Sequence, residues 1–202
     1  MTQLALFDQR IELLDGKLGS AIYRPSFVAF AEAASWFETL LSGIDWRADR
    51  RVMYDREVDV PRLRAHFAIG GPRGVEGTQA LDERVTEVIG EAAKRVTQTL
   101  GAPFNSVGLN FYRDGNDSVA PHNDRLAELV EGQPIALLSL GDTRRMLIRR
   151  KDASAPAVPI DLAAGSLLVM NHSSQIHYTH GIAKTRARVG PRISLAFRVR
   201  PS

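Results

Sequence analysis

The hydrophobic period of this chain changes near its middle, and this change limits the folds that the chain can adopt. Residues 79–100 place apolar side chains at helical spacing, and Gly101 follows as a stop signal. From residue 107 onward the period changes: apolar and polar side chains alternate over residues 107–112, and further short runs separated by turn signals follow, as in strands. Many short strands at such spacing favour a sandwich or a barrel. Helices followed by strands therefore predict an α+β fold in which the helices brace one sheet from outside.

The pattern predicts two helices and six short strands. A first helix is expected over residues 26–41, with Ser26 as its N-cap, and a second over residues 79–100. Both are expected to pack against the core rather than to bind a ligand. The strands are expected at residues 107–112, 135–140, 145–150, 158–162, 166–170 and 193–199.

The composition is that of a soluble globular domain. The 202 residues are 44% hydrophobic and 24% charged, and no internal repeat or linker divides them, so a single domain is expected. No apolar run approaches the roughly 20 residues of a membrane span, and the N-terminus lacks the pattern of a secretion signal. Because cysteine is absent, disulfides, thiolate metal sites and cysteine nucleophiles are excluded, which is compatible with a cytoplasmic location.

Positive charge is concentrated in the second half of the chain. Residues 1–100 hold 13 basic and 15 acidic side chains, whereas residues 101–202 hold 13 basic and 8 acidic ones. Basic clusters at residues 144–145, 149–151 and 184–188 are suited to neutralising phosphate groups. A solvated surface that favours arginine explains the same clusters equally well.

A metal site is indicated by His122-x-Asp124 together with a histidine further along the chain. Side chains two positions apart point the same way when the backbone is extended. Two histidines and one carboxylate on one face of a metal suit non-haem Fe(II), whose oxygenases need open coordination positions. The candidates for the second histidine are His172, His177 and His180.

Four polar side chains are expected to face a pocket beside this metal site. Asn110 and Tyr112 share one face of their strand, and Arg192 and Arg198 share one face of the last strand. A guanidinium group forms forked, charge-assisted bonds to a carboxylate, so two inward arginines suit a dicarboxylate. A metal-binding set beside such arginines is what an enzyme requires to hold 2-oxoglutarate against iron.

Five motifs occur in a fixed order along the second half of the chain. They are N-x-Y-x-x-G at residues 110–115, H-x-D at 122–124, S-L-G-x-x-R at 139–144, G-S-L-L-V-M at 165–170 and R-x-S-L-x-F-R at 192–198. In this order they resemble the AlkB family of Fe(II)/2-oxoglutarate-dependent dioxygenases. The resemblance implies a double-stranded β-helix, or jelly roll, with N-terminal helices packed on the outer face of its major sheet. Residues 1–100 would then form a helix-rich support and substrate-lid region, and residues 101–202 the catalytic jelly-roll core.

The resemblance also implies which residues hold the iron and what reaction follows. His180 becomes the third metal ligand beside His122 and Asp124, and His177 lies near the pocket without coordinating. The implied cofactor is Fe(II), with 2-oxoglutarate and O2 as co-substrates. The implied reaction is oxidative dealkylation of N-alkylated nucleobases in DNA or RNA, with release of formaldehyde, succinate and CO2.

For the co-substrate, the resemblance assigns four side chains. Arg192 is expected to hold the distal carboxylate of 2-oxoglutarate with help from Tyr112. Arg198 and Asn110 are expected to approach the carboxylate that chelates iron.

Two departures from the family pattern bear on the substrate. After Pro61-Arg62-Leu63 and Arg64, the expected lid has the sequence AHFAIGGPRGVEGT with Phe67 as its aromatic residue, and Arg125 rather than an acid follows the H-x-D motif. These features favour a neutral lesion, a phosphate-bearing substrate or another substrate class. A flipped base could stack on Phe67, Tyr178 or the imidazole of His122, although a role in core packing is the alternative for both Phe67 and Tyr178.

Two other functions stay open at this point. One is the same chemistry on a protein side chain, a lipid or a small metabolite. The other is a jelly-roll module that binds metal without turnover, which would not require the two arginines. Nothing in the sequence indicates a membrane or an obligate protein partner.

Overall fold

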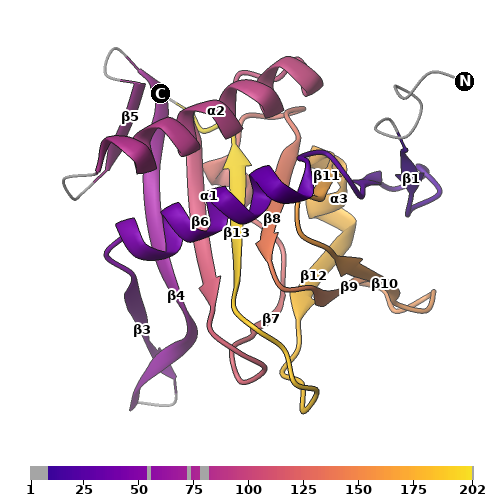
Figure 1. Cartoon of the computed structure of the whole chain (residues 1–202). Coiled ribbons are helices and arrows are strands. Elements are labelled where there is room, and N and C mark those ends of the chain that lie inside the picture. The colour runs from indigo at the N-terminus through magenta and orange to yellow at the C-terminus, as the bar shows by residue number, and fades with distance from the viewer. Residues whose placement is uncertain (1–8, 54–55, 72–73, 78–81, 202) are drawn as a thin grey trace, which may run out of the picture.

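The structure, a computed structural model, describes the backbone of residues 9–53, 56–71, 74–77 and 82–201, and the side chains of all of these except residues 49–53, 56–59 and 71. Its strands form two antiparallel sheets (Figure 1). The major sheet has the order β1 (Ile11–Glu12), β2 (Ala21–Arg24), β11 (Leu167–Met170), β8 (Ile135–Gly141), β13 (Arg192–Arg198), β6 (Ser106–Tyr112), β4 (Arg56–Gly71) and β3 (Arg47–Met53), with β5 (Gly74–Gly77) paired to β4. The minor sheet has the order β10 (Val158–Leu162), β9 (Arg144–Arg150), β12 (Tyr178–Ile182) and β7 (Val119–His122).

Two long helices cover the outer face of the major sheet. The helices α1 (Phe30–Gly43) and α2 (Glu83–Leu100) lie side by side across it (Figure 1). Their buried side chains form one hydrophobic cluster with outward-facing residues of β6, β8 and β13. No helix in the described part of the chain has both the length and the apolar character that a membrane crossing requires. The predicted α+β fold, with its helices outside the major sheet, is confirmed.

The inner face of the major sheet packs against the minor sheet. A second hydrophobic cluster joins Leu137 and Ala196 of the major sheet to Met146, Ile148 and Ile182 of the minor sheet. Alternate residues of each central strand therefore belong to different layers, as the period of two requires. The side chains between the two sheets that are not apolar form the candidate site described below.

The six predicted strands and the two predicted helices are present, with corrections at the helix starts. The first helix begins at Phe30 with Ala29 in the cap position and no side-chain cap, so the prediction that Ser26 is the N-cap is wrong. The residues before it are tied instead to the turn before β11, where the amide of Val28 donates to the carbonyl of Gly165 at 2.9 Å. The second helix is capped by Asp82, and Gly101 terminates it as predicted. Residues 79–81, where the helix was expected to begin, lie outside the described part.

The first hundred residues contribute strands as well as helices. The long strand β4 pairs with β6, and β5 folds back on β4. The sequence after Leu63, which was expected to form a lid loop, therefore belongs largely to this hairpin, and Pro72 and Arg73 lie outside the described residues. A short third helix, α3 (His172–His177), precedes β12.

We predict that Gly165→Ala destabilises the fold. Gly165 has a φ of +73°, and a Cβ atom there would lie against the carbonyl oxygen of Val28. The expected loss in the free energy of unfolding is about 2–3 kcal/mol, measured by urea denaturation. Gly132→Ala is the matched control, because its φ is +77° but a Cβ there meets no atom within 4 Å. An equal loss in both variants would show that backbone conformation, not the contact with Val28, sets the cost.

Candidate active site

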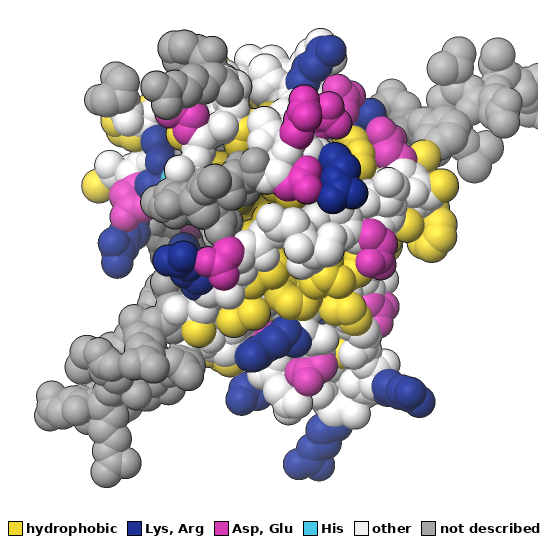
Figure 2. Space-filling view, turned by 60° about the vertical axis from the view of Figure 1, so that its left-hand side comes forward, with side chains coloured by type: hydrophobic (Ala, Val, Ile, Leu, Met, Phe, Trp, Pro, Cys, Tyr) yellow, Lys and Arg dark blue, Asp and Glu magenta, His cyan; other side chains and the backbone are white. Residues whose placement is uncertain are grey.

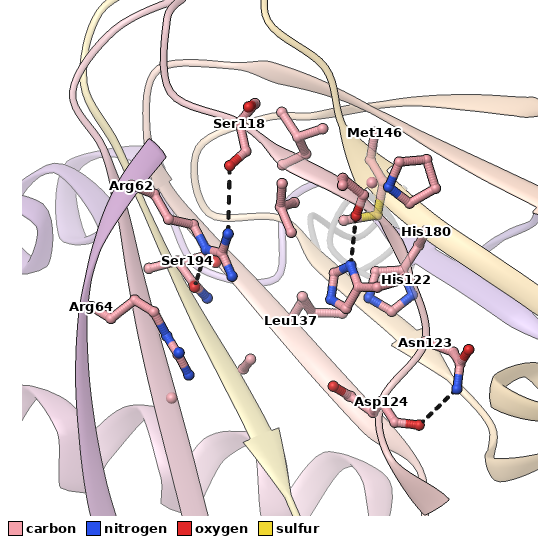
Figure 3. Close-up of a pocket in the computed structure, with 18 of the residues that line it drawn as sticks. Arg62, Arg64, Ser118, His122, Asn123, Asp124, Leu137, Met146, His180 and Ser194 are labelled. Carbon is pink, nitrogen blue, oxygen red and sulfur yellow. Dashed lines mark hydrogen bonds between the residues drawn. The ribbon is translucent and has the colours of Figure 1, made fainter. Parts of the chain in front are cut away.

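A cavity of about 920 Å³ opens between the two sheets. Strands β4, β6 and β13 of the major sheet and β7 and β12 of the minor sheet contribute to its lining (Figure 3). All seven side chains that the sequence singled out line this one cavity: Asn110, Tyr112, His122, Asp124, His180, Arg192 and Arg198. In Figure 3, Arg62 and Arg64 lie on one side of it and His122, His180 and Asp124 on the other.

His122 and His180 are neighbours across two paired strands. They are directly opposite each other in the β7–β12 register, and their ring centroids are 4.5 Å apart. The Nδ1 atom of His122 lies 2.9 Å from the carbonyl oxygen of Ala120. A carbonyl oxygen only accepts, so Nδ1 carries the proton and Nε2 keeps its lone pair.

Burial keeps both rings neutral. His180 is 5% exposed, and its pKa is lowered to about 3 by burial and then by the neighbouring His122. Burial also lowers the pKa of His122. A neutral imidazole is the form that binds a metal ion, so at neutral pH both side chains are in the state that ligation requires.

Asp124 is held by Arg198. Its two oxygens accept from Nη2 and Nε of Arg198, each at 3.0 Å, and its amide donates to Oε1 of Gln175 at 3.1 Å. Burial alone would raise the pKa of Asp124, but the charge and hydrogen bonds of Arg198 hold it below its usual value. The carboxylate is therefore ionised.

No three His, Asp or Glu side chains among the described residues meet at metal-binding spacing.

Arg192 is a fully buried cation with unused donors. Its side chain is 0% exposed, its Nη2 donates to the hydroxyl of Ser139 at 2.8 Å, and its guanidinium lies 5.3 Å from the centroid of the Tyr112 ring. Burial lowers its pKa to about 10, so it stays charged at neutral pH. Its Nε and Nη1 atoms have no acceptor in the described part of the protein. Buried donors of this kind are rare without a ligand or water to accept them.

Asn110 and Gly108 of β6 also line the cavity. The side-chain oxygen of Asn110 accepts from Nε of Arg62 at 2.8 Å. Gly108 leaves room for Arg198, because a Cβ there would lie 3.3 Å from its Nη1. The sequence placed Asn110 on the correct face but indicated no role for Arg62, which precedes the expected lid.

Arg144 is a structural residue that sequence analysis placed in a basic surface cluster. It is 2% exposed, and its guanidinium donates to the backbone carbonyls of Asp114, Asp117 and Ala183 at 2.8–2.9 Å. It also lies 5.6 Å from the centroid of the Tyr112 ring. Arg144 thus joins the turn after β6 to the segment after β12 and packs beside the site. Its position within a strand, on the same face as Met146 and Ile148, was the available signal.

The aromatic residues considered for base stacking lie elsewhere, apart from His122. Phe67 belongs to the cluster under the helices, and Tyr178 to the cluster between the sheets. Both are therefore packing residues. Of the basic clusters, only Arg149 and Lys184 are among the described residues that line the cavity. His172 and His177 begin and end α3 and do not line it.

Comparisons with known proteins agree with this arrangement. A family model described as the 2OG-Fe(II) oxygenase superfamily matches residues 20–198. This chain belongs to that family. The solved structure of OsALKBH1 superposes with a TM-score of 0.57 at 14% identity, covering 95% of this chain and 100% of that one, and shows the same fold. The AlkB resemblance and the jelly-roll fold expected from the motifs are confirmed.

The curated relatives are AlkB homologues by name. DNA oxidative demethylase ALKBH2 of Homo sapiens is 30% identical over 179 residues, covering 83% of this chain and 69% of the relative. ALKBH2 of Bos taurus is 36% identical over 118 residues, covering 55% and 42%. Alpha-ketoglutarate-dependent dioxygenase alkB homolog 3 of Mus musculus is 30% identical over 182 residues, covering 86% and 64%. The chain thus spans between 42% and 69% of the length of these relatives.

We predict that Arg144→Met lowers stability strongly. The change leaves three carbonyl groups without their donor, which is expected to cost about 2–4 kcal/mol in urea denaturation. The matched control is Arg145→Met, whose side chain is 65% exposed and pairs with Asp161, and almost no change is expected there. Equal stability of the two variants would contradict the structural role of Arg144.

Proposed function

We propose that this protein is an Fe(II)/2-oxoglutarate-dependent dioxygenase that removes alkyl groups from the bases of nucleic acids. The observation that carries the proposal is the buried Arg192, whose Nε and Nη1 have no acceptor among the described residues and which lines the same cavity as two neutral histidines. An unpaired buried cation is costly, so a site that keeps one is built for a ligand of opposite charge.

The cavity suits a dicarboxylate. The N–H groups on Nε and Nη1 of Arg192 have no acceptor among the described residues, so they would donate to a carboxylate at one end of 2-oxoglutarate. Tyr112, packed beside Arg192, would complete that end. Arg198 and Asn110 would approach the other carboxylate from the same face of the sheet. Ser194 lies between the two arginines on that face of β13, and it is opposite Asn110 in the register.

The chemistry of the donor set suits iron. His122 and His180 would ligate through neutral imidazoles, and Asp124 through an ionised carboxylate. Each oxygen of Asp124 accepts one hydrogen bond from Arg198 and keeps another lone pair that could ligate the metal. When bound, Fe(II) with 2-oxoglutarate and O2 supplies the oxidising power to hydroxylate a C–H bond. The protein binds the reactants, orients them and excludes water.

Nucleic acid is the substrate class best supported. Two of the relatives are named DNA oxidative demethylases. The lining of the cavity is rich in arginine, whereas the face seen in Figure 2 carries basic and acidic side chains interspersed. In the net reaction, an N-methyl base, 2-oxoglutarate and O2 give the free base, formaldehyde, succinate and CO2. A cavity of this size would accept a base that has been turned out of its strand.

The direct test is succinate release from 2-oxoglutarate under air with Fe(II) and single-stranded DNA. We predict stimulation by an N-methylated oligonucleotide and none by its unmethylated twin. Succinate release that methylated DNA leaves unchanged would retain the dioxygenase and reject this substrate. No release under any condition would reject the enzyme and favour a module that binds metal only.

Asp124→Asn tests the metal site in the same assay. It keeps an acceptor for Arg198 but removes the ligand charge, so we expect loss of turnover and a large loss of Fe(II) binding with the fold retained by circular dichroism. Asn123→Ala is the matched control, because among the described residues its side-chain amide donates only to the carbonyl of Asp124. Wild-type metal binding by Asp124→Asn would contradict the assignment.

Arg192→Met tests the co-substrate site by its effects on the affinity for 2-oxoglutarate and on the stability of the ligand-free protein. We predict that the affinity for 2-oxoglutarate falls by about 100-fold or more, because the partner of a buried carboxylate is removed. The ligand-free protein should be no less stable than wild type, because a buried cation with unused donors is replaced by an apolar side chain. Both are measured by thermal denaturation with and without 2-oxoglutarate. Arg149→Met, at an exposed lining position, should leave both unchanged.

A further inference from the structure

The cavity is strongly cationic. Its described lining holds eight arginine or lysine side chains but only two carboxylates, those of Asp124 and Glu128. Arg198 is paired with Asp124, and a bound dicarboxylate would take the charge of Arg192, so six basic side chains still remain. Two of them, Arg62 and Arg64, have contacts of their own, and the other four are Arg125, Arg149, Lys184 and Arg200.

Both carboxylates are already paired with arginine. Asp124 accepts two hydrogen bonds from Arg198. Glu128 accepts from Nη1 of Arg200 at 2.9 Å and from Nη1 of Arg125 at 3.1 Å. These hydrogen bonds lower the pKa of Glu128, first that of Arg200 and then that of Arg125, so its ionised charge is matched by two cations. Among the described lining residues, no carboxylate is left to face a positively charged base.

Arg125 lies at the cavity, where its charge can act on a bound substrate. It directly follows Asp124, lines the cavity and keeps 82% of its side chain exposed, with Glu128 at 41%. An exposed guanidinium at the mouth of a cavity interacts with a bound charge over several ångströms at low ionic strength. Repulsion of a cation is therefore its expected effect.

We infer that this cavity selects alkylated bases that stay neutral at physiological pH over those that alkylation makes cationic, and that Arg125 contributes to the selection. The inference rests on the proposed function and adds the charge class of the substrate to it. Methylation of thymine at N3 replaces an N–H and leaves the ring neutral. Methylation of cytosine at N3 occupies a ring lone pair and makes the ring cationic. The two lesions carry the methyl group at the same position and differ in charge.

The experiment compares these two lesions in otherwise identical single-stranded oligonucleotides at low salt. Demethylation is followed by mass spectrometry with the full chain, Fe(II) and 2-oxoglutarate, and kcat/KM is taken for each. Wild type should favour 3-methylthymine over 3-methylcytosine by about fivefold or more. Arg125→Glu should shift this ratio toward 3-methylcytosine by about fivefold or more. The ratio is taken within one variant, so changes in iron or 2-oxoglutarate binding cancel.

Arg145→Glu is the matched control. Arg145 is exposed and paired with an acid, as Arg125 is, but it does not line the cavity, so the same change in net charge should leave the ratio unaltered. A wild-type preference for 3-methylcytosine, or equal ratios for wild type and Arg125→Glu, would overturn the inference while the proposed function stands. If neither oligonucleotide is demethylated and neither stimulates succinate release, both fail together.

Discussion

The buried guanidinium of Arg192 is the feature on which the rest of the site depends. Removing a cation from water costs several kcal/mol even after the protein relaxes around it. Here one hydroxyl group and one aromatic ring offset only part of that cost, and two donors have no acceptor in the part of the chain that the structure describes. Such a group persists only where the surrounding structure holds it firmly. The pairing of β13 with β8 on one side and β6 on the other provides that support, since Arg192 is opposite both Gly141 and Tyr112.

The same strand joins the core to the site. Ile193, Leu195 and Phe197 pack under the helices, while Arg192, Ser194 and Arg198 line the cavity. A shift of one residue in register would bury the arginines under α1 and α2 and turn the apolar side chains into the cavity. The hydrophobic cluster therefore fixes the register, and the register fixes which polar groups meet. Helix packing outside the sheet is in this sense a condition for ligand binding inside it.

The parts of the fold that sequence predicted are those with a clear period or with turn signals on both sides. The stripe of α2, the alternation in β6 and β13, and the short runs between turns at β8 and β9 were sufficient to place these elements, and the alternation in β6 put Asn110 and Tyr112 on one face. The hairpin of β4 and β5 was missed because its glycines indicate a loop. Strand β7 was missed because Pro121 disfavours a strand interior, although it is tolerated here at the edge of the minor sheet.

Roles that depend on distant partners were beyond sequence reasoning. Arg144 belongs to a run of basic residues, and nothing local shows that the carbonyls of Asp114 and Ala183, 30 and 39 residues away, converge on it. The ion pairs of Glu128 with Arg125 and Arg200 depend in the same way on how the chain returns past its last strand. The charge of each residue was visible in the sequence, but its partner was not.

The residues between the two arginines of β13 explain how one small ligand can reach both. Six strand residues separate their Cα atoms by about 20 Å, so the two side chains must lean toward each other across the sheet. Arg198 does so, since its Nη1 donates back to the carbonyl of Ala196 at 3.2 Å. Ser194 and Ala196 on β13 are small, and Gly108 is opposite Ala196 on β6. Larger side chains there would fill the space between the guanidinium groups. The small residues are therefore as necessary as the arginines, because they keep open the part of the cavity between the two guanidinium groups.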